Sequence, residues 1–235
     1  MKNFYKRKTY EGFSLIEMLI TMVILGFIML ISALVLTTLL KVSVTSTNKA
    51  RVRTNSEYVL ELLRRTIRTT NPDYVHVYKS SGRTYNANTG DVVIPRFEDN
   101  VHPNFREINY STETGNEIHI KPNNSEKWIC LAYYKSADSE DKVKGYILKT
   151  YADNLKDHSK CFDVTENPSH NYMVLNTRFV SVDDFKIKVR DTVESNKIIQ
   201  LDITSSAVFW YFGKDGIISR SFNRQAIVKT EGVIW

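Results

Sequence analysis

The sequence predicts an α+β protein, in which one long amino-terminal helix precedes an antiparallel, β-rich globular domain. Three observations lead to this prediction. Residues 13–40 form an apolar run of 28 residues with a single charge, Glu17. Residues 50–70 repeat apolar side chains at helical spacing. Residues 71–235 contain short runs rich in Val, Ile, Tyr and Phe, separated by Asn, Asp, Ser and Gly clusters, as antiparallel strands do.

The composition excludes several classes of protein. The chain has 235 residues, 42% hydrophobic and 25% charged, which is ordinary for a folded protein and argues against disorder throughout. Only one stretch is apolar enough to span a bilayer, so a multi-span membrane protein is excluded. Half of the net charge of +6 lies in residues 1–12, so the basic isoelectric point is weak evidence for nucleic-acid binding.

The apolar run has the length of a membrane span. A helix of 28 residues is about 42 Å long, enough to cross a bilayer with tilt. It is longer than the apolar core of an ordinary signal peptide. Four Lys or Arg residues precede it and four follow within residues 41–53, so the positive-inside rule leaves its orientation open.

The helix is expected to continue beyond the apolar run. No Pro occurs before Pro72, and no Gly between Gly26 and Gly82. Apolar residues then mark one helical face, namely Val52, Val59, Leu60, Leu63 and Ile67. Asn71-Pro72 is a natural stop. We therefore predict one helix from about residue 13 to 70, on the order of 87 Å long, whose second half packs through Leu60, Leu63 and Ile67.

Glu17 is the unusual residue of the apolar run. A charged side chain at mid-bilayer costs on the order of 2.5–3.5 kcal/mol on insertion scales. Glu17 should therefore either have a partner or lie near the lipid headgroups.

The segment from Gly12 to Glu17 resembles the class III signal of type IV prepilins and pseudopilins. It combines a short basic leader, Gly12, the sequence Phe13-Ser14-Leu15-Ile16-Glu17 and about twenty apolar residues. The resemblance implies that a prepilin peptidase cuts between Gly12 and Phe13 on the cytoplasmic side and methylates the new amino terminus of Phe13. It also implies that Glu17 pairs with the Phe13 amine of a neighbouring subunit, which favours assembly and sets its register.

The same resemblance implies a localisation and a set of partners. The chain would cross the bacterial cytoplasmic membrane once, with its carboxy-terminal domain outside, and then enter a pilus or pseudopilus. Its partners would be the prepilin peptidase, other pilin or pseudopilin subunits through the helix, and the inner-membrane assembly platform. The expected organisation is a cleaved leader (1–12), a membrane and assembly half of the helix (13–40), an amphipathic half (41–70) and an extracytoplasmic β-rich domain (71–235).

The β-rich domain is expected to be antiparallel, with no repeat and no second helix. Its best hairpin joins residues 185–190 to 197–204, and a second turn is expected at Lys214-Asp215-Gly216. The candidate strands are Tyr74–Tyr78, Val92–Ile94, Glu107–Tyr110, Glu117–Lys121, Trp128–Tyr134, Tyr146–Thr150, Phe185–Arg190, Lys197–Thr204 and Val208–Phe212.

A domain of this size after a long helix resembles the larger minor subunits, namely the J-class minor pseudopilin of type II secretion and the W-type minor pilins. The apolar run also lacks the Pro that many major pilins carry, which leans towards the same group.

No catalytic or metal-binding motif is evident. His76, His102, His119, His158 and His170 do not pair at metal-ligand spacing, and the common nucleophile and phosphate-loop motifs are absent. We therefore expect no enzymatic activity, no metal and no cofactor.

Three features of the domain leave alternatives open. Cys130 and Cys161 either form a disulfide in an oxidising compartment or are two separate buried thiols. The acidic loop 137–141 is read as a solvated turn rather than a calcium site. The aromatic and basic residues of 128–135 fit a sheet core, or a surface that binds nucleic acid.

The leading functional interpretation is a minor pilin or pseudopilin that acts at the filament tip or in assembly initiation. The alternative is a pilus-associated adhesin or a DNA-uptake subunit of a competence apparatus. A third interpretation is a plain membrane-anchored extracytoplasmic protein. The sequence leaves open whether the machine is a pilus, a secretion system or a competence apparatus.

Overall fold

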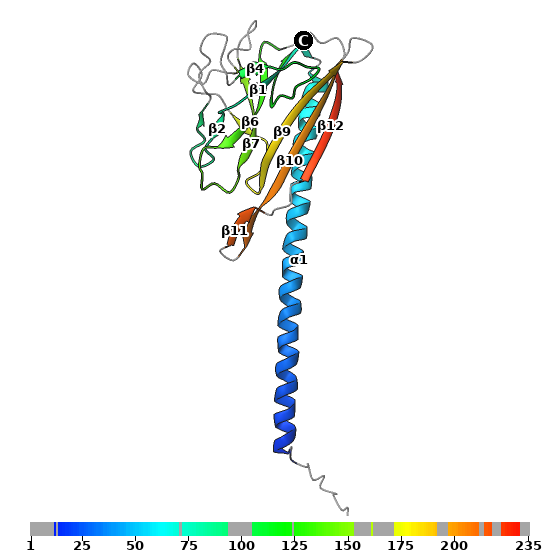
Figure 1. Ribbon diagram of the computed structural model, residues 1–235, viewed down its shortest axis with the longest axis vertical. Helices are drawn as coiled ribbons and strands as arrows, with labels where there is room; N and C mark the ends of the chain where they lie inside the picture. The colour runs from blue at the N-terminus through cyan, green and yellow to red at the C-terminus, as the bar shows by residue number, and fades with distance from the viewer. Residues whose placement is uncertain are drawn as a thin grey trace, which may run out of the picture. The chain divides into compact units, whose positions relative to one another are not determined.

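The structure is a computed structural model. It describes residues 12, 14–70, 72–93, 105–123, 125–152, 161, 172–191, 197–211, 214–217 and 222–230. The chain divides into two compact units, residues 1–47 and residues 48–235. The helix α1 (Leu15–Thr69) contributes to both, and Figure 1 shows the strands of the second unit.

In the first unit, α1 has no tertiary cover. Every residue from Ser14 to Ser43 is exposed. The hydroxyl groups along this stretch donate to backbone carbonyls of the preceding turn, with distances of 2.9 Å from Thr21 to Met18, 2.7 Å from Ser32 to Ile28 and 2.9 Å from Thr38 to Leu34. Each hydroxyl is therefore satisfied within the helix, as a membrane-spanning segment requires.

The predicted helix is confirmed within two residues at its start and one at its end. Its predicted apolar face is also confirmed, because Val52, Val59, Leu60, Leu63 and Ile67 are at most 4% exposed. This face explains why the second half of α1 belongs to the globular unit. The helix ends one turn before Pro72, which cannot donate the next helical hydrogen bond.

An eight-stranded sheet forms one part of the globular unit. It runs β3-β2-β6-β5-β1-β4, and β7 pairs with β6 and with β8. Only the β2–β6 pair is parallel among these described strands. The strands are β1 (Pro72–Ser80), β2 (Thr84–Tyr85), β3 (Val92–Val93), β4 (Phe105–Glu107), β5 (Glu117–Pro122), β6 (Trp128–Ser136), β7 (Gly145–Ala152) and β8 (Met173–Val174).

A four-stranded antiparallel sheet forms the other part. Its centre is the long strand β10 (Lys197–Tyr211), which pairs with β9 (Val180–Asp191), β11 (Lys214–Ile217) and β12 (Phe222–Thr230). The predicted hairpin is confirmed as β9–β10, with Leu201 opposite Ile187.

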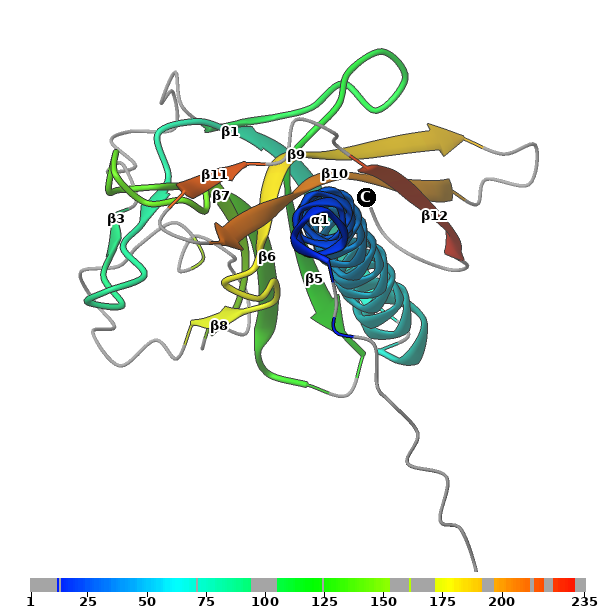
Figure 2. The same cartoon turned by 90° about the horizontal axis from the view of Figure 1, so that it is seen from below.

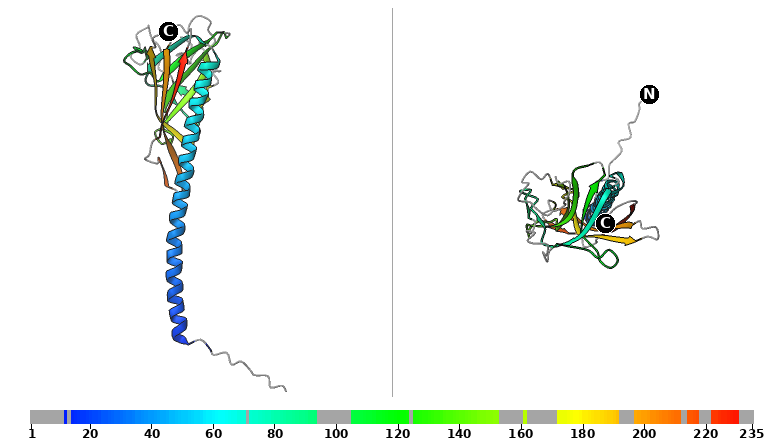
Figure 3. Two further views of the ribbon diagram at one scale, coloured as in Figure 1. Left: turned by 90° about the vertical axis from the view of Figure 1, so that its right-hand side faces the viewer. Right: turned by 90° about the horizontal axis from the view of Figure 1, so that it is seen from above.

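The core of this unit lies between both sheets and α1, as the view from below shows (Figure 2). The alternating inward residues of β1, β5 and β6 meet those of β9 and β10 around Leu63 and Ile67. Figure 3 shows the same packing from the side and from above. Gly115 and Ile187 exchange backbone hydrogen bonds of 2.9 and 2.8 Å, which joins the two sheets directly.

Several predicted strand limits are wrong. Residues Lys214–Gly216, expected in a turn, lie in β11, where Lys214 pairs with Tyr211 and Gly216 with Phe209. The Asp-Gly signal at 215–216 is local, and the pairing with β10 overrides it.

Two further strand predictions need correction. The strand expected over 107–110 includes only Glu107, because β4 ends there and Ile108 instead donates to the Val77 carbonyl. The strand expected at 208–212 is not separate, since β10 runs unbroken to Tyr211. Ile94 and Phe212 lie outside the described residues, as do the whole of 94–104 and all of 153–171 except Cys161.

The fold class is α+β, as expected. Among the described residues, α1 is the single α-helix. The strands β2, β8 and β12 were not predicted, and the first two have only two residues each, too few to show a pattern.

Candidate functional site

The candidate site begins at Gly12, immediately before the helix. Gly12 is exposed, and a Cβ atom added there would meet no atom within 4 Å. A larger side chain at this position therefore costs nothing in the folding of the chain. Phe13, the predicted residue after the cut, lies outside the described residues.

Ser14 and Glu17 cap the helix that follows. The Ser14 amide donates to the Glu17 carboxylate at 3.0 Å, and the Glu17 amide donates to the Ser14 hydroxyl at 3.3 Å. This reciprocal pair is a capping box, the sequence signature of which is Ser-x-x-Glu before an apolar run. The sequence analysis missed this local role of Glu17, although the signature was present.

The capping box gives Glu17 a partner within its own chain. The carboxylate accepts from a backbone amide, and its negative charge also lies at the positive end of the helix. Both residues are exposed, so the Glu17 carboxylate is also accessible to a cation from another chain.

The helix behind this cap presents large apolar side chains to its surroundings on every side. Leu15 is 84% exposed and Met22 72%. The stretch is long and apolar enough to cross a membrane by length and composition. An apolar surface of this extent on a soluble monomer marks a membrane or a protein interface.

Residues 7–38 match the family model of the prokaryotic N-terminal methylation motif. This match supports the prepilin family, whose members are structural pilin subunits rather than enzymes. The match, called the prepilin motif below, covers Arg7 and Lys8 of the basic segment, Gly12, Glu17 and most of the apolar run. No curated protein and no solved structure matches the chain.

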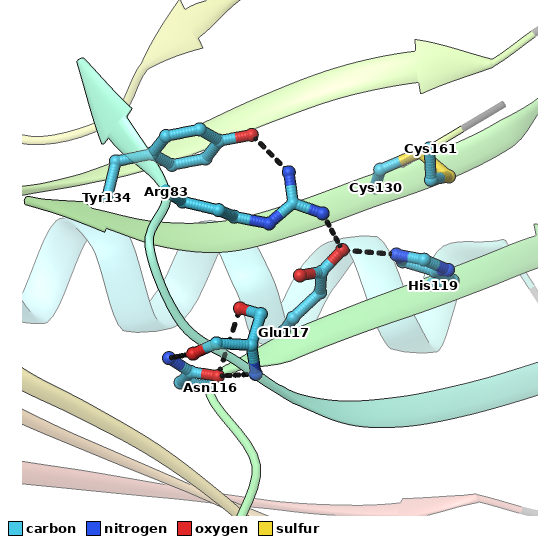
Figure 4. Close-up of polar contacts among 8 residues, drawn as sticks. Arg83, Asn116, Glu117, His119, Cys130, Tyr134 and Cys161 are labelled. Carbon is cyan, nitrogen blue, oxygen red and sulfur yellow. Dashed lines mark hydrogen bonds and ion pairs between the residues drawn. A yellow bond between two sulfur atoms is a disulfide. The ribbon is translucent and has the colours of Figure 1, made fainter. Parts of the chain in front are cut away.

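Outside the prepilin motif, the largest group of buried charge lies in the eight-stranded sheet (Figure 4). Arg83, between β1 and β2, donates to the Tyr134 hydroxyl at 2.8 Å and to the Glu117 carboxylate at 2.5 Å. His119 Nε2 lies 2.6 Å from the same carboxylate oxygen. All four residues are at most 3% exposed.

The surroundings of this network fix its charge. Burial favours a raised pKa for Glu117, but the positive charge of Arg83 and the hydrogen bond from His119 outweigh it and lower that pKa. Burial lowers the pKa of His119, so this ring is neutral at pH 7 and donates its Nε2 proton to Glu117. Burial raises the pKa of Tyr134 to about 12. The network is thus one cation and one anion, and it ties the Arg83 loop to β5 and β6.

The two cysteines form a disulfide, with a Cα–Cα distance of 5.8 Å. Cys130 on β6 and Cys161 are buried together with Trp128 and Ala152. The bond thus holds Cys161 against the face of the sheet that lies opposite α1.

The other features of the domain serve the fold. Among the described residues, no group of His, Cys, Asp or Glu could hold a metal ion, and His102, His158 and His170 lie outside that part of the chain. Asp141 of the acidic loop accepts from Ser136 at 2.9 Å and Tyr146 at 2.6 Å, so its carboxylate fixes the turn between β6 and β7.

The aromatic residues of 128–135 do not form a binding surface. Trp128 and Tyr134 are at most 3% exposed, and Tyr133 packs against the main core. A sheet core therefore accounts for them, as the first of the two interpretations expected.

Proposed function

We propose that this chain is a minor pilin or pseudopilin, a structural subunit of a type IV pilus or a type II secretion-like filament. One observation carries the proposal: an exposed apolar helix follows Gly12 and Glu17 in the register of the N-terminal methylation motif. The subunit is processed by a prepilin peptidase between Gly12 and Phe13 and is methylated at Phe13.

Assembly moves the apolar helix from lipid into a bundle of like helices. In lipid, the helix exposes apolar side chains and internally bonded hydroxyls over residues 18–40, so this stretch is stable in the membrane before assembly. In the bundle, the Glu17 carboxylate pairs with the Phe13 amine of a neighbour. Neither charge is well paired in lipid, so this contact favours association.

A minor role, at the tip or in assembly initiation, is consistent with the globular unit. Two sheets pack on one side of α1, and the disulfide and the Arg83–Glu117 pair fix the loops of the larger sheet. In the resembled family, the major subunits that form the filament shaft are typically smaller than this chain. The other subunits encoded beside this chain, and not the chain itself, would identify which machine it serves.

The alternative role as a DNA-uptake subunit receives no support from strand β9. The exposed cations of β9 are matched by acids, since Lys186 pairs with Asp184, and Lys188 lies 3.6 Å from Asp202. Nucleic-acid binding needs a cationic surface that is free to release counterions.

The test is the mass and amino-terminal sequence of the full chain recovered from its own cells. We expect a chain that begins at methylated Phe13 and a Gly12→Trp variant that keeps Met1. Because Gly12 has open space around it, this variant should fold. Its loss of cleavage would then report that the peptidase no longer recognises the site.

Gly26→Trp is the matched control, since Gly26 also has open space and lies beyond the cut. It should be processed normally. An intact Met1 in the unaltered chain, or cleavage of Gly12→Trp, would refute the proposal.

A further inference from the structure

Two arginines that have no acidic partner among the described residues lie over one aromatic ring of the globular unit. We name this group the proximal patch, and it consists of Arg51, Arg178 and Phe179. The Arg51 guanidinium lies 5.2 Å and that of Arg178 5.1 Å from the centre of the Phe179 ring. Both arginines are exposed.

The charge of the proximal patch is not neutralised by the described residues. Neither of its two cations forms an ion pair there, whereas Arg53, Arg64 and Arg65 of the same helix pair with Glu57 or Glu61. Residues 18–56 contain no Asp or Glu at all. The two guanidinium groups lie at most about 10 Å apart, the sum of their distances to the ring, so they repel each other until an anion joins them.

Hydrogen bonds hold the turn that contains Arg178 and Phe179 in place. Asn176, 5% exposed, accepts from the Ile147 amide at 3.0 Å and donates to the carbonyls of Gly145 at 3.3 Å and Val180 at 2.9 Å. The Phe179 carbonyl accepts from the Val208 amide at 2.9 Å. The patch is therefore held in place before any ligand arrives, which lowers the entropy cost of binding.

The place of Arg51 in the sequence points to the lipid surface. The 26 residues from Leu15 to Leu40 form a helix of about 39 Å, enough to cross a hydrocarbon core of about 30 Å when the helix tilts. Arg51 follows Leu40 by eleven residues, and basic residues that closely follow a membrane span attract anionic lipid headgroups.

We propose that the proximal patch binds the phosphate of an anionic phospholipid headgroup in the membrane that α1 spans. Arg binds phosphate oxygens through two parallel hydrogen bonds, and its stacking on Phe179 leaves the edge of the guanidinium free to do so. Binding would hold the globular unit on the bilayer before the subunit is extracted into a filament. The inference rests on the proposed function, because it needs α1 to be in a membrane.

The experiment measures which lipids the purified full chain retains. The chain, in detergent micelles with equal amounts of phosphatidylglycerol and phosphatidylcholine, is analysed by native mass spectrometry. Each basic side chain near an anionic surface contributes about fivefold in affinity, so the preference for phosphatidylglycerol should fall by about 30-fold in Arg51→Gln/Arg178→Gln.

The matched control is Arg65→Gln/Arg68→Gln, which removes the same charge from the other end of the same helical segment. It should keep the preference of the unaltered chain. If the preference for phosphatidylglycerol fell equally in both double variants, net charge alone would explain it and the inference would be overturned. Retention of the preference in Arg51→Gln/Arg178→Gln would also overturn it.

Two further outcomes separate this inference from the proposed function. Capture of free inorganic phosphate at the same patch, with no preference between the lipids, would overturn the lipid assignment. The location of the chain is tested by alkaline carbonate extraction of cell membranes. A chain that stays in the membrane but shows no lipid preference refutes the patch alone, whereas a chain that is extracted refutes the proposed function.

Discussion

Ser14 and Glu17 bond to each other at the start of α1, amide to carboxylate at 3.0 Å and amide to hydroxyl at 3.3 Å. The same carboxylate is proposed to pair with the Phe13 amine of a neighbouring subunit. Glu17 thus has a local role in the isolated chain and a proposed intersubunit role in the filament. The two roles need different chemistry, since a cap needs an acceptor and an ion pair needs a charge.

The two roles of Glu17 can be separated by substitution. Gln at this position still accepts from the Ser14 amide, because Glu and Gln serve equally in a capping box, but it has no charge. We expect both Glu17→Gln and Glu17→Leu to be processed and to fail in filament incorporation, measured by the fraction of the protein in sheared filaments. Normal incorporation of Glu17→Gln would show that the cap, and not the charge, is what matters.

Arg83 is expected to be the most sensitive side chain of the eight-stranded sheet. Arg83→Met leaves the Glu117 carboxylate buried without its cation, which costs about 3–5 kcal/mol of unfolding free energy. Arg53→Met removes the exposed Arg53–Glu57 pair and should cost less than about 1 kcal/mol. Denaturant unfolding of the full chain in detergent measures both. Similar losses in the two variants would contradict a structural role for the buried network.

The same network predicts a pH dependence of stability. The pKa of His119 in the folded protein lies below its ordinary value of 6.5, so the unfolded chain takes up a proton that the folded chain does not. Stability therefore falls as pH falls below 6.5, by at most about 1.4 kcal/mol per pH unit for this one group.

Glu117 acts in the same direction at lower pH. Its folded pKa is lowered, so its contribution is present above its ordinary value of 4.5 and is lost as pH falls through the folded pKa. The check is the unfolding free energy at pH 7, 6 and 5 for the full chain and for His119→Gln. The variant should show the flatter dependence, and equal slopes would refute the assignment to His119.

Removal of the Cys130–Cys161 disulfide should lower stability without changing processing. The bond closes a loop with a sequence separation of 31, for which the chain-entropy model gives about 3–4 kcal/mol. We expect a lower melting temperature for Cys130→Ala/Cys161→Ala and for the reduced chain. A reducing agent should leave the double variant unchanged, and a fall there would point to a different target.

Gly115 is expected to tolerate no side chain. An added Cβ would lie 2.5 Å from Val77 Cγ1 and 2.6 Å from the Tyr78 carbonyl oxygen, and the latter is backbone that cannot rotate away. Gly115→Ala should cost about 1–3 kcal/mol, the usual range for overpacking, and should loosen the contact with Ile187. Gly26→Ala, where nothing lies within 4 Å, is the control and should not destabilise the chain.

The N-terminal methylation motif could be recognised in the sequence because it is local. Gly12, Glu17 and the apolar run are neighbours along the chain, and each has its meaning in a fixed register before one helix. The amphipathic face was equally readable, since Val52, Val59, Leu60, Leu63 and Ile67 repeat with the period of a helix. The capping box was readable too, and was missed only because Glu17 was interpreted through its cost in lipid.

The limits of the strands were harder to predict. The β9–β10 hairpin was predicted because its alternation is regular and its strands are adjacent in sequence. The turn at Lys214-Asp215-Gly216 was wrong, because the Asp-Gly signal is local whereas pairing with β10 places these residues in β11. Strands of two residues, such as β2 and β8, form because a neighbouring strand pairs with them, and they carry no pattern of their own.

By itself, then, the sequence determined the fold class, the helix with its apolar face, and the prepilin motif, because each depends on residues within a few turns of one another. Only the tertiary structure decided which distant groups meet: Arg83 with Glu117 and Tyr134, Cys130 with Cys161, and Arg51 with Phe179 and Arg178. Sequence periodicity tells which side of an element faces inward. The partner that it meets there is set by sheet order and register, which depend on contacts summed over the whole domain.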